Sequence, residues 1–104
     1  MPTVGVFPVD ELGPGEMKHV SAGGRSLCVY NLGGELCAIE DRCSHDDGPL
    51  CEGDWDEDEC RVVCPRHGSQ FDLATGRPLT LPAIEPVDTF PVVVEDGIVR
   101  VELP

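Results

Sequence analysis

The sequence predicts an all-β protein whose antiparallel strands close into a sandwich or small barrel. Three observations lead to this fold class. Short alternating runs of apolar and polar residues recur along the chain, and 12 glycines and 10 prolines are scattered between them. No segment shows the sustained helical period of apolar residues that an amphipathic helix requires. Short runs bounded by turn residues are typical of antiparallel meanders.

Seven runs are expected to form strands. In chain order they are residues 3–7, 18–20, 25–32, 35–40, 59–64, 88–94 and 98–102. Gly33 and Gly34 join the third run to the fourth, while Asp96 and Gly97 join the last two runs as a type I′ hairpin. Each of these turns predicts an antiparallel pair of neighbouring strands.

The middle of the chain breaks this pattern. From residue 41 to about 72 the sequence is rich in glycine, proline, cysteine, histidine and acids, with 59–64 as its one convincing strand. We interpret residues 1–104 as a single domain in which an insert, about 41–72, is carried on a β base formed by 1–40 and 73–104. Because functional residues concentrate on loops held by a rigid scaffold, the insert is where the function is expected.

The charge of the chain limits the partners it can have. The sequence holds 20 acidic and 7 basic residues, which gives a net charge of −13. Such a charge argues against nucleic acid or an anionic membrane as a partner, and it suits docking onto a basic protein surface. No run of 18 apolar residues is present, and the N-terminus carries no export signal. We therefore expect a soluble, cytoplasmic monomer.

Six cysteines in a chain of this length favour metal binding, because a reducing compartment disfavours a framework of disulfides. Cys28 and Cys37 lie within predicted strands and are expected to be small buried hydrophobic residues. Cys51 and Cys60 lie on either side of an acidic run and could pair with each other, although free thiols are the expectation in the cytoplasm.

The other two cysteines each have a histidine close by. Cys43 and His45 form one short loop, and Cys64 and His67 form a second after eighteen intervening residues. A structural zinc finger normally pairs cysteine with cysteine and histidine with histidine, whereas each half is mixed here. A 2Fe–2S cluster with two cysteines on one iron and two histidines on the other suits such mixed halves.

Together with the residues that follow them, the two loops resemble the signature of the Rieske iron–sulfur proteins. Residues 68–72 read Gly-Ser-Gln-Phe-Asp after the second loop, 75–77 stand where that family has a glycine-containing turn, and 82–83 stand at its proline loop. The resemblance covers nearly the whole chain. It implies a Rieske-type antiparallel β sandwich or barrel with a two-loop cluster-binding insert.

The resemblance also implies a set of ligands for a Rieske 2Fe–2S cluster. Cys43 and Cys64 would bind one iron through sulfur, and His45 and His67 would bind the other through a ring nitrogen. The remaining ring nitrogens would face solvent, which is the shortest route for an electron to a partner. His19, in an early strand without a nearby cysteine, is interpreted as an ordinary surface histidine.

The chain differs from the high-potential branch of that family. Those proteins join their two loops by a disulfide, whereas Asp47 and Arg66 stand at the corresponding positions here. Phe71 replaces a tyrosine whose hydroxyl lies near a ligand sulfur, although Ser69 remains as a hydrogen-bond donor. Fewer hydrogen bonds to sulfur and more nearby negative charge disfavour the reduced state. We therefore expect a low potential, about −150 mV rather than about +300 mV.

Eight acidic residues lie between the two ligand pairs. They are Asp46, Asp47, Glu52, Asp54, Asp56, Glu57, Asp58 and Glu59. The run is either a solvated loop or a docking surface, and its closeness to the expected electron exit favours docking. Trp55, inside the run, is interpreted as an apolar anchor of the loop rather than a partner contact.

These features predict an electron-transfer protein rather than an enzyme. The resemblance is to the ferredoxin components of ring-hydroxylating dioxygenase systems, which implies a flavoprotein reductase using NAD(P)H as donor and a terminal oxygenase as acceptor. No substrate-binding domain or mononuclear iron motif follows the loops. Two alternatives stay open, namely the small subunit of an assimilatory nitrite reductase and an interaction module built on structural zinc.

Overall fold

The computed structural model of the chain describes residues 3–42, 50–65, 68–80 and 85–103. Within these ranges the elements are β1 (Thr3–Pro8), η1 (Val9–Glu11), β2 (Met17–Ala22), β3 (Arg25–Leu32), β4 (Glu35–Glu40), η2 (Leu50–Glu52), β5 (Trp55–Asp56), β6 (Arg61–Val63), β7 (Gln70–Asp72), β8 (Thr89–Phe90), β9 (Val92–Glu95) and β10 (Ile98–Glu102). The strand pairs among them are antiparallel. The predicted all-β fold class is confirmed.

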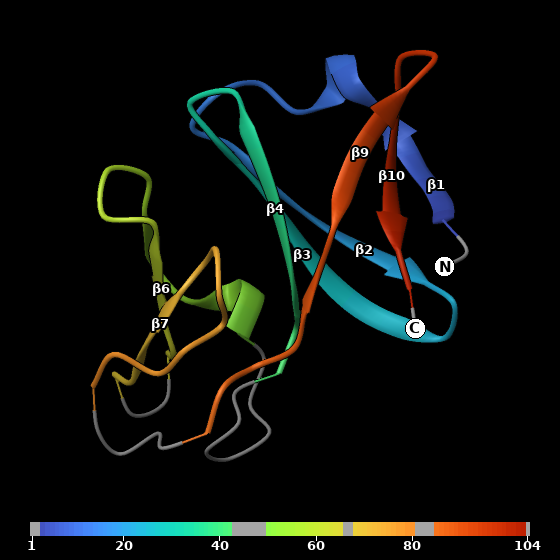
Figure 1. Cartoon of the computed structure of the whole chain (residues 1–104). Helices are drawn as coiled ribbons and strands as arrows, with labels where there is room; N and C mark the ends of the chain where they lie inside the picture. The colour runs from blue at the N-terminus through green and yellow to red at the C-terminus, as the bar shows by residue number, and fades with distance from the viewer. Residues whose placement is uncertain (1–2, 43–49, 66–67, 81–84, 104) are drawn as a thin grey trace.

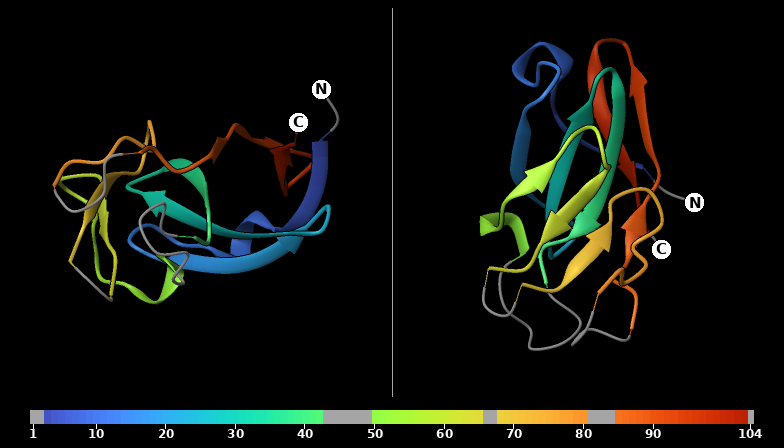
Figure 2. Two further views of the ribbon diagram at one scale, coloured as in Figure 1. Left: turned by 90° about the horizontal axis from the view of Figure 1, so that it is seen from below. Right: turned by 90° about the vertical axis from the view of Figure 1, so that its left-hand side faces the viewer.

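The strands form three small sheets arranged as successive layers (Figure 1). Their orders are β1-β10-β9, β2-β3-β4-β8 and β5-β6-β7. The four-stranded sheet is the middle layer, with the first sheet on one side and the β5-β6-β7 sheet on the other, as the view from below also shows (Figure 2). We call the first two sheets the base and the third the outer sheet.

Two hydrophobic cores explain this layering, and β3 contributes to both. Leu27 and Val29 pack into the core shared with the first sheet, while Cys28 and Tyr30 pack into the core shared with the outer sheet. All four side chains are fully buried. Since successive side chains of a strand point to opposite faces, a strand buried along its whole length indicates a sheet covered on both sides.

The base follows the sequence prediction closely. The bounds of β3, β4 and β10 are those predicted, because alternating apolar residues and glycine turns define them locally. Asp96 and Gly97 both have positive φ, at 53° and 75°, as a type I′ turn requires. The predicted strand at 88–94 is divided by Pro91, which has no N–H to donate, so that β8 pairs with β4 and β9 pairs with β10.

The prediction of one convincing strand in the insert is wrong. Within 41–72 the structure has β5 and β7 on either side of β6, paired through Trp55 with Val62 and Phe71 with Val62. The strand itself is shorter than predicted, and it begins later because Cys60 adopts a left-handed φ of 55° just before Arg61. The boundaries of the insert, about 41–72, stay a prediction.

The cysteines also differ from the prediction. Cys28 is fully buried as expected, but it forms a disulfide with Cys51, from which it is separated by 23 positions in the sequence. The expectation of a free thiol at Cys51 is wrong, because folding brings the two Cα atoms to 5.7 Å, a separation that a disulfide spans. Cys37 and Cys60 are free thiols, each partly buried.

Among the described residues, no helix has the length and apolar character needed to cross a membrane.

Candidate functional site

Of the four predicted ligands, the structure describes Cys64. The other three, Cys43, His45 and His67, lie outside the described residues. Cys64 follows β6 directly, and its side chain is buried, with 1% of the residue exposed. A buried cysteine outside a disulfide, placed at a strand end, is a preformed sulfur donor if a metal reaches it.

The backbone around Cys64 is held by the turn between β6 and β7. Val63 pairs with Gln70 across the two strands. The Cys64 N–H donates to the Ser69 carbonyl at 2.7 Å, and the Gly68 N–H donates to the Cys64 carbonyl at 3.0 Å. Gly68 has a φ of 73°, which glycine adopts at little cost. The position of Cys64 therefore depends on backbone bonds of the chain itself.

The segment after η2 packs closely against this strand end. The Val63 N–H donates to the Asp54 carbonyl at 2.7 Å. A Cβ atom added at Gly53 would overlap the carbonyl oxygen of Val63, so a glycine is needed for this approach. The contact places the backbone that leaves η2 beside the residue before Cys64. The sequence had singled out no role for Gly53.

Figure 1 shows that the C-terminal ends of β4 and β6 lie at the same end of the molecule. Asp41 and Arg42 follow β4 and come just before Cys43 in the sequence. The chain thus brings the residue before the first predicted loop and the first residue of the second loop to one side of the fold. A common site for the two loops requires this arrangement.

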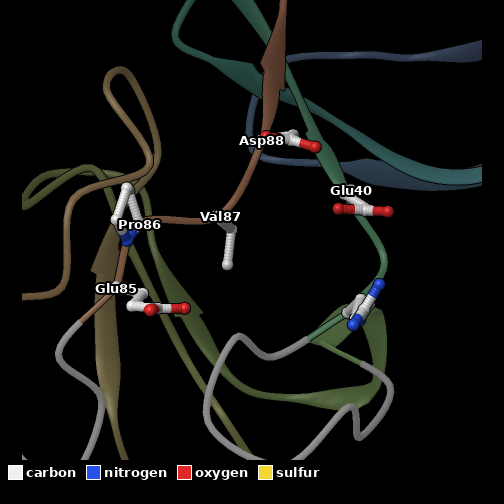
Figure 3. A pocket seen from close by; sticks show the side chains of 6 residues that line it. Glu40, Glu85, Pro86, Val87 and Asp88 are labelled. Atoms are coloured by element: carbon white, nitrogen blue, oxygen red, sulfur yellow. The ribbon is translucent and has the colours of Figure 1, made fainter.

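A small depression with an acidic lining lies at the same end. Its volume is about 160 Å³, and its lining is Glu40, Arg42, Glu85, Pro86, Val87 and Asp88. Figure 3 shows the carboxylates of Glu40, Glu85 and Asp88 placed around it. The Glu40 N–H donates to the Asp88 carbonyl at 2.9 Å, which joins the two segments that form its walls. With three carboxylates and one guanidinium in its lining, this depression has a negative charge that suits binding of a basic side chain.

The acidic run between the predicted ligand pairs is divided in the structure. Residues 57–60 form the tip of the β5–β6 hairpin, at the opposite end of β6 from Cys64. Four residues of extended chain correspond to about 13 Å. The tip instead lies near glycine turns of the base. A Cβ atom added at Gly15 would lie 3.6 Å from the carboxylate of Glu57, and one added at Gly33 would lie 4.0 Å from it. The hairpin tip is therefore separated from Cys64, while the closeness of the run to the expected electron exit stays a prediction, because His45 and His67 lie outside the described residues.

The residues before the tip have other surroundings. Trp55 packs edge-on against Tyr30 of the middle sheet, with ring centroids 5.0 Å apart, which supports its interpretation as an anchor. The Tyr30 hydroxyl is buried and has no hydrogen-bond partner among the described residues. Burial, and secondarily the charge of Asp41, raise the pKa of Tyr30 well above its ordinary value.

A cluster of polar side chains that the sequence did not predict lies beside Cys51, on the exposed side of the disulfide. His19 Nε2 lies 2.5 Å from Ser26 Oγ and 3.3 Å from a carboxylate oxygen of Asp41. The other carboxylate oxygen of Asp41 accepts the Cys51 N–H at 2.7 Å. Only the register of β2 and β3, which places His19 opposite Cys28, could have suggested this grouping. The surface position expected for His19 is correct, but its surroundings were not foreseen.

Cys64, the one predicted ligand that the structure describes, has surroundings that suit an iron–sulfur cluster. Cys64 offers a sulfur at a position fixed by backbone hydrogen bonds, next to the buried Ser69. Apolar side chains from both sheets, including Ile39 and Phe71, pack into the same core as Cys64. A thiolate donor beside an apolar core with limited access to water is typical of such sites.

Comparison with known proteins agrees with this reading of the fold. Residues 3–91 match the family model for the Rieske [2Fe-2S] domain. The 3-phenylpropionate/cinnamic acid dioxygenase ferredoxin subunit of Escherichia coli (strain K12) is 41% identical over 97 residues, which is 93% of this chain and 90% of that protein.

Two solved structures are similar over nearly their whole length. The ferredoxin of carbazole 1,9a-dioxygenase from Nocardioides aromaticivorans IC177 has a TM-score of 0.90 and 32% identity, covering 97% of each chain. A chain from the complex of reduced oxygenase and oxidised ferredoxin in carbazole 1,9a-dioxygenase has a TM-score of 0.86 and 34% identity, covering 95% of this chain and 91% of that chain. The chain described here belongs to the Rieske [2Fe-2S] domain family.

Proposed function

We propose that this protein is a low-potential Rieske ferredoxin that passes single electrons to a terminal oxygenase and catalyses no reaction of its own. One observation carries the proposal. The chain matches a dioxygenase ferredoxin subunit at 41% identity across nine-tenths of both proteins, so the likeness is to a complete carrier. The solved complex of a similar ferredoxin with its oxygenase supports the nature of the acceptor.

In this proposal the cluster is held by two residues from each loop. Cys43 and Cys64 are the sulfur ligands, and His45 and His67 are the nitrogen ligands. A Rieske cluster supplies reversible transfer of one electron at a time. The role of the protein is to hold the donor atoms in place. For Cys64 the backbone bonds to Ser69 and Gly68 do so, and the apolar core beside it limits access of water.

A low potential follows from the surroundings of the ligands. Phe71 is fully buried and has no hydroxyl to donate to a sulfur. Glu52 and Asp54 lie on either side of Gly53, whose backbone contacts Val63, so their charges are close to the strand end that carries Cys64. Negative charge near a cluster disfavours addition of an electron. We propose a midpoint potential below zero.

The docking surface for the oxygenase is proposed at the acidic depression beside β4. Its carboxylates at Glu40, Glu85 and Asp88 suit a lysine or arginine of the partner. A flavoprotein reductase using NAD(P)H is the proposed electron donor, on the resemblance described above. A monomeric state and a cytoplasmic location stay predictions.

The cofactor is tested with the purified protein and two matched variants. We expect iron and sulfide in equal amounts, a red-brown colour, and uptake of one electron per chain with a midpoint potential below zero. Cys64→Ala should lose the iron and the colour, because it removes a sulfur ligand. Cys37→Ala, which removes a free thiol on β4, should keep both. A colourless protein that contains zinc would refute the proposal, and a midpoint well above zero would refute its low-potential form.

The docking surface is tested by the rate of electron transfer to a ring-hydroxylating terminal oxygenase. We expect a rate that falls steeply with added salt, as it does when opposite charges steer association. The double variant Glu40→Gln and Asp88→Asn should slow transfer at low salt by about tenfold. The control Asp58→Asn and Glu59→Gln removes the same charge from the hairpin tip and should have a small effect. Equal effects of the two double variants would show that only net charge matters and would refute this docking site.

A further inference from the structure

We propose that Cys28 and Cys51 form a reversible dithiol–disulfide site, opened by thiol reductants at Cys51, which fastens η2 to the middle sheet. The disulfide joins β3 to η2 and so connects the base to the segment packed against the strand end of Cys64. This inference concerns redox chemistry in the protein itself, separate from the proposed transfer of electrons to an oxygenase.

The two sulfur atoms differ in their access to solvent. Cys28 has none of its surface exposed and belongs to the core between the middle sheet and the outer sheet. Cys51 is partly exposed and lines an open depression of about 380 Å³. The other residues of this lining are Met17, His19, Asp41 and Glu52. A small thiol can therefore reach the disulfide through Cys51, and only through that side among the described surfaces.

The imidazole of His19 lies where it assists this exchange. The ring nitrogen of His19, a carboxylate oxygen of Asp41 and the sulfur of Cys51 all lie within 4.8 Å of one another. A cation or proton donor beside a sulfur stabilises its thiolate, which improves the sulfur as a leaving group. The Cys51 N–H donates a hydrogen bond to the other carboxylate oxygen of Asp41 at 2.7 Å, which keeps the sulfur near the imidazole.

The exchange consumes two thiols of a reductant such as glutathione. The thiolate of the first attacks the Cys51 sulfur, the bond between the protein sulfurs breaks, and the Cys28 sulfur leaves with the electron pair and takes up a proton. The second thiolate attacks the reductant's sulfur in the mixed disulfide, and Cys51 leaves as a thiolate beside His19. The products are two protein thiols and one molecule of oxidised reductant. Oxidised glutathione reverses both steps.

The bond has a direct mechanical consequence. With the disulfide closed, η2 is fastened to β3, and Gly53 immediately after η2 lies against the carbonyl of Val63. Opening the bond leaves η2 held by non-covalent packing alone. We therefore expect the reduced form to release its metal centre faster than the oxidised form, because the backbone next to Cys64 loses a constraint.

The site is tested on the holoprotein equilibrated with glutathione buffers of graded redox ratio. Free thiols are alkylated after acid quenching, and the peptides are identified by mass spectrometry. We expect a peptide pair linked through Cys28 and Cys51 in oxidising buffers, replaced by two alkylated cysteines in reducing ones. If the linked pair never forms, or if it survives every buffer, the proposal is wrong. This readout does not depend on which metal the protein holds, so it can fail while the proposed electron carrier stands.

Variants separate the role of each residue. His19→Gln keeps a polar side chain next to Ser26 but cannot carry a positive charge, and it should slow the second step of reduction by glutathione about tenfold, because Cys51 leaves as a thiolate in that step. Cys37→Ser should leave the rate unchanged. An unchanged rate in His19→Gln would refute the role of the imidazole.

The mechanical consequence has its own measurement. Loss of visible absorbance in the presence of a chelator should be several-fold faster in reducing buffer than in oxidising buffer for the wild-type protein. In Cys51→Ser the rate should be fast in both buffers, and in Cys37→Ser it should follow the wild type. The same dependence on buffer in Cys51→Ser would show that another group responds, and it would refute the role of the disulfide.

Discussion

The base and the outer sheet are held together in different ways. Strands β3 and β4 of the base pair over six residues, and glycine turns join β2, β3 and β4 into a continuous meander. In the outer sheet β5 has two residues and β6 and β7 have three each. Strands this short form few ladder hydrogen bonds, and such a sheet is not stable by itself. The outer sheet must draw its stability from contacts with the base.

Those contacts come mainly from one face of the middle sheet. Cys28, Tyr30 and Ile39 project from β3 and β4 into the core that also contains Val62 and Phe71 of the outer sheet. The edge-on packing of Trp55 on Tyr30 and the disulfide from Cys28 add to this interface. The region that carries the proposed metal centre is thus stabilised by side chains of the base, and a change on β3 is expected to affect the site.

Substitution of Gly53 should have the largest effect on the outer sheet. In Gly53→Ala the new Cβ overlaps the carbonyl oxygen of Val63 and lies 3.1 Å from Pro65 Cδ, so the backbone on one side must move. Overpacking of this kind costs about 1–3 kcal/mol, and we expect about 2–3 kcal/mol here because the obstacle is backbone. Chemical denaturation gives the free energy of unfolding, and the visible spectrum reports the metal centre.

A glycine of the base provides the comparison for this experiment. An added Cβ at Gly5 of β1 would meet the ends of two side chains, of Arg100 and Ile98, each at 3.3 Å. Those side chains can give way, so Gly5→Ala should cost less than about 1 kcal/mol and leave the spectrum unchanged. A loss of stability in Gly53→Ala as small as that in Gly5→Ala would contradict the close approach of the two segments beside Cys64.

The difference between the base and the outer sheet also explains which strands the sequence could predict. The bounds of β3, β4 and β10 were predicted correctly because alternation and turn glycines are local signals. Strands β5 and β7 were missed because two or three residues carry no period, and they become strands by pairing with β6. Strand length in the outer sheet is decided by pairing with β6, which no alternation within β5 or β7 records.

The candidate site was predicted in the same uneven way. The mixed spacing of Cys64 and His67 is a local motif, and it led to the family that the comparisons identify. Three features that depend on long-range contacts were not foreseen, namely the disulfide of Cys28, the polar group around His19, and the separation of the hairpin tip from Cys64. Sequence proximity suggested that the acids cluster near the site, whereas β6 separates the tip from Cys64.

Tyr30 lies at the centre of the contact between the base and the outer sheet. Its substitution should have the smallest effect on the free energy of unfolding at neutral pH. Its hydroxyl is buried with no hydrogen-bond partner among the described residues, so the group gains nothing from burial. Tyr30→Phe should therefore leave the free energy of unfolding unchanged at pH 8, or raise it by up to about 1 kcal/mol. A loss of about 1 kcal/mol or more, measured by denaturation, would show that the hydroxyl is bonded after all.

At alkaline pH the same variant should become the more stable protein. Burial raises the pKa of Tyr30 above its ordinary value near 10, so above that pH the unfolded chain loses the phenolic proton while the folded chain keeps it. The contribution of Tyr30 to stability is full below pH 10 and is lost as pH rises toward the folded pKa, by about 1.4 kcal/mol per pH unit. Because the chain has 1 tyrosine, the ultraviolet absorbance of tyrosinate reports this group directly. Tyrosinate that forms near pH 10 in the folded protein would mean that water reaches the interface between the base and the outer sheet, and that the two regions are packed less closely than the core around Tyr30 indicates.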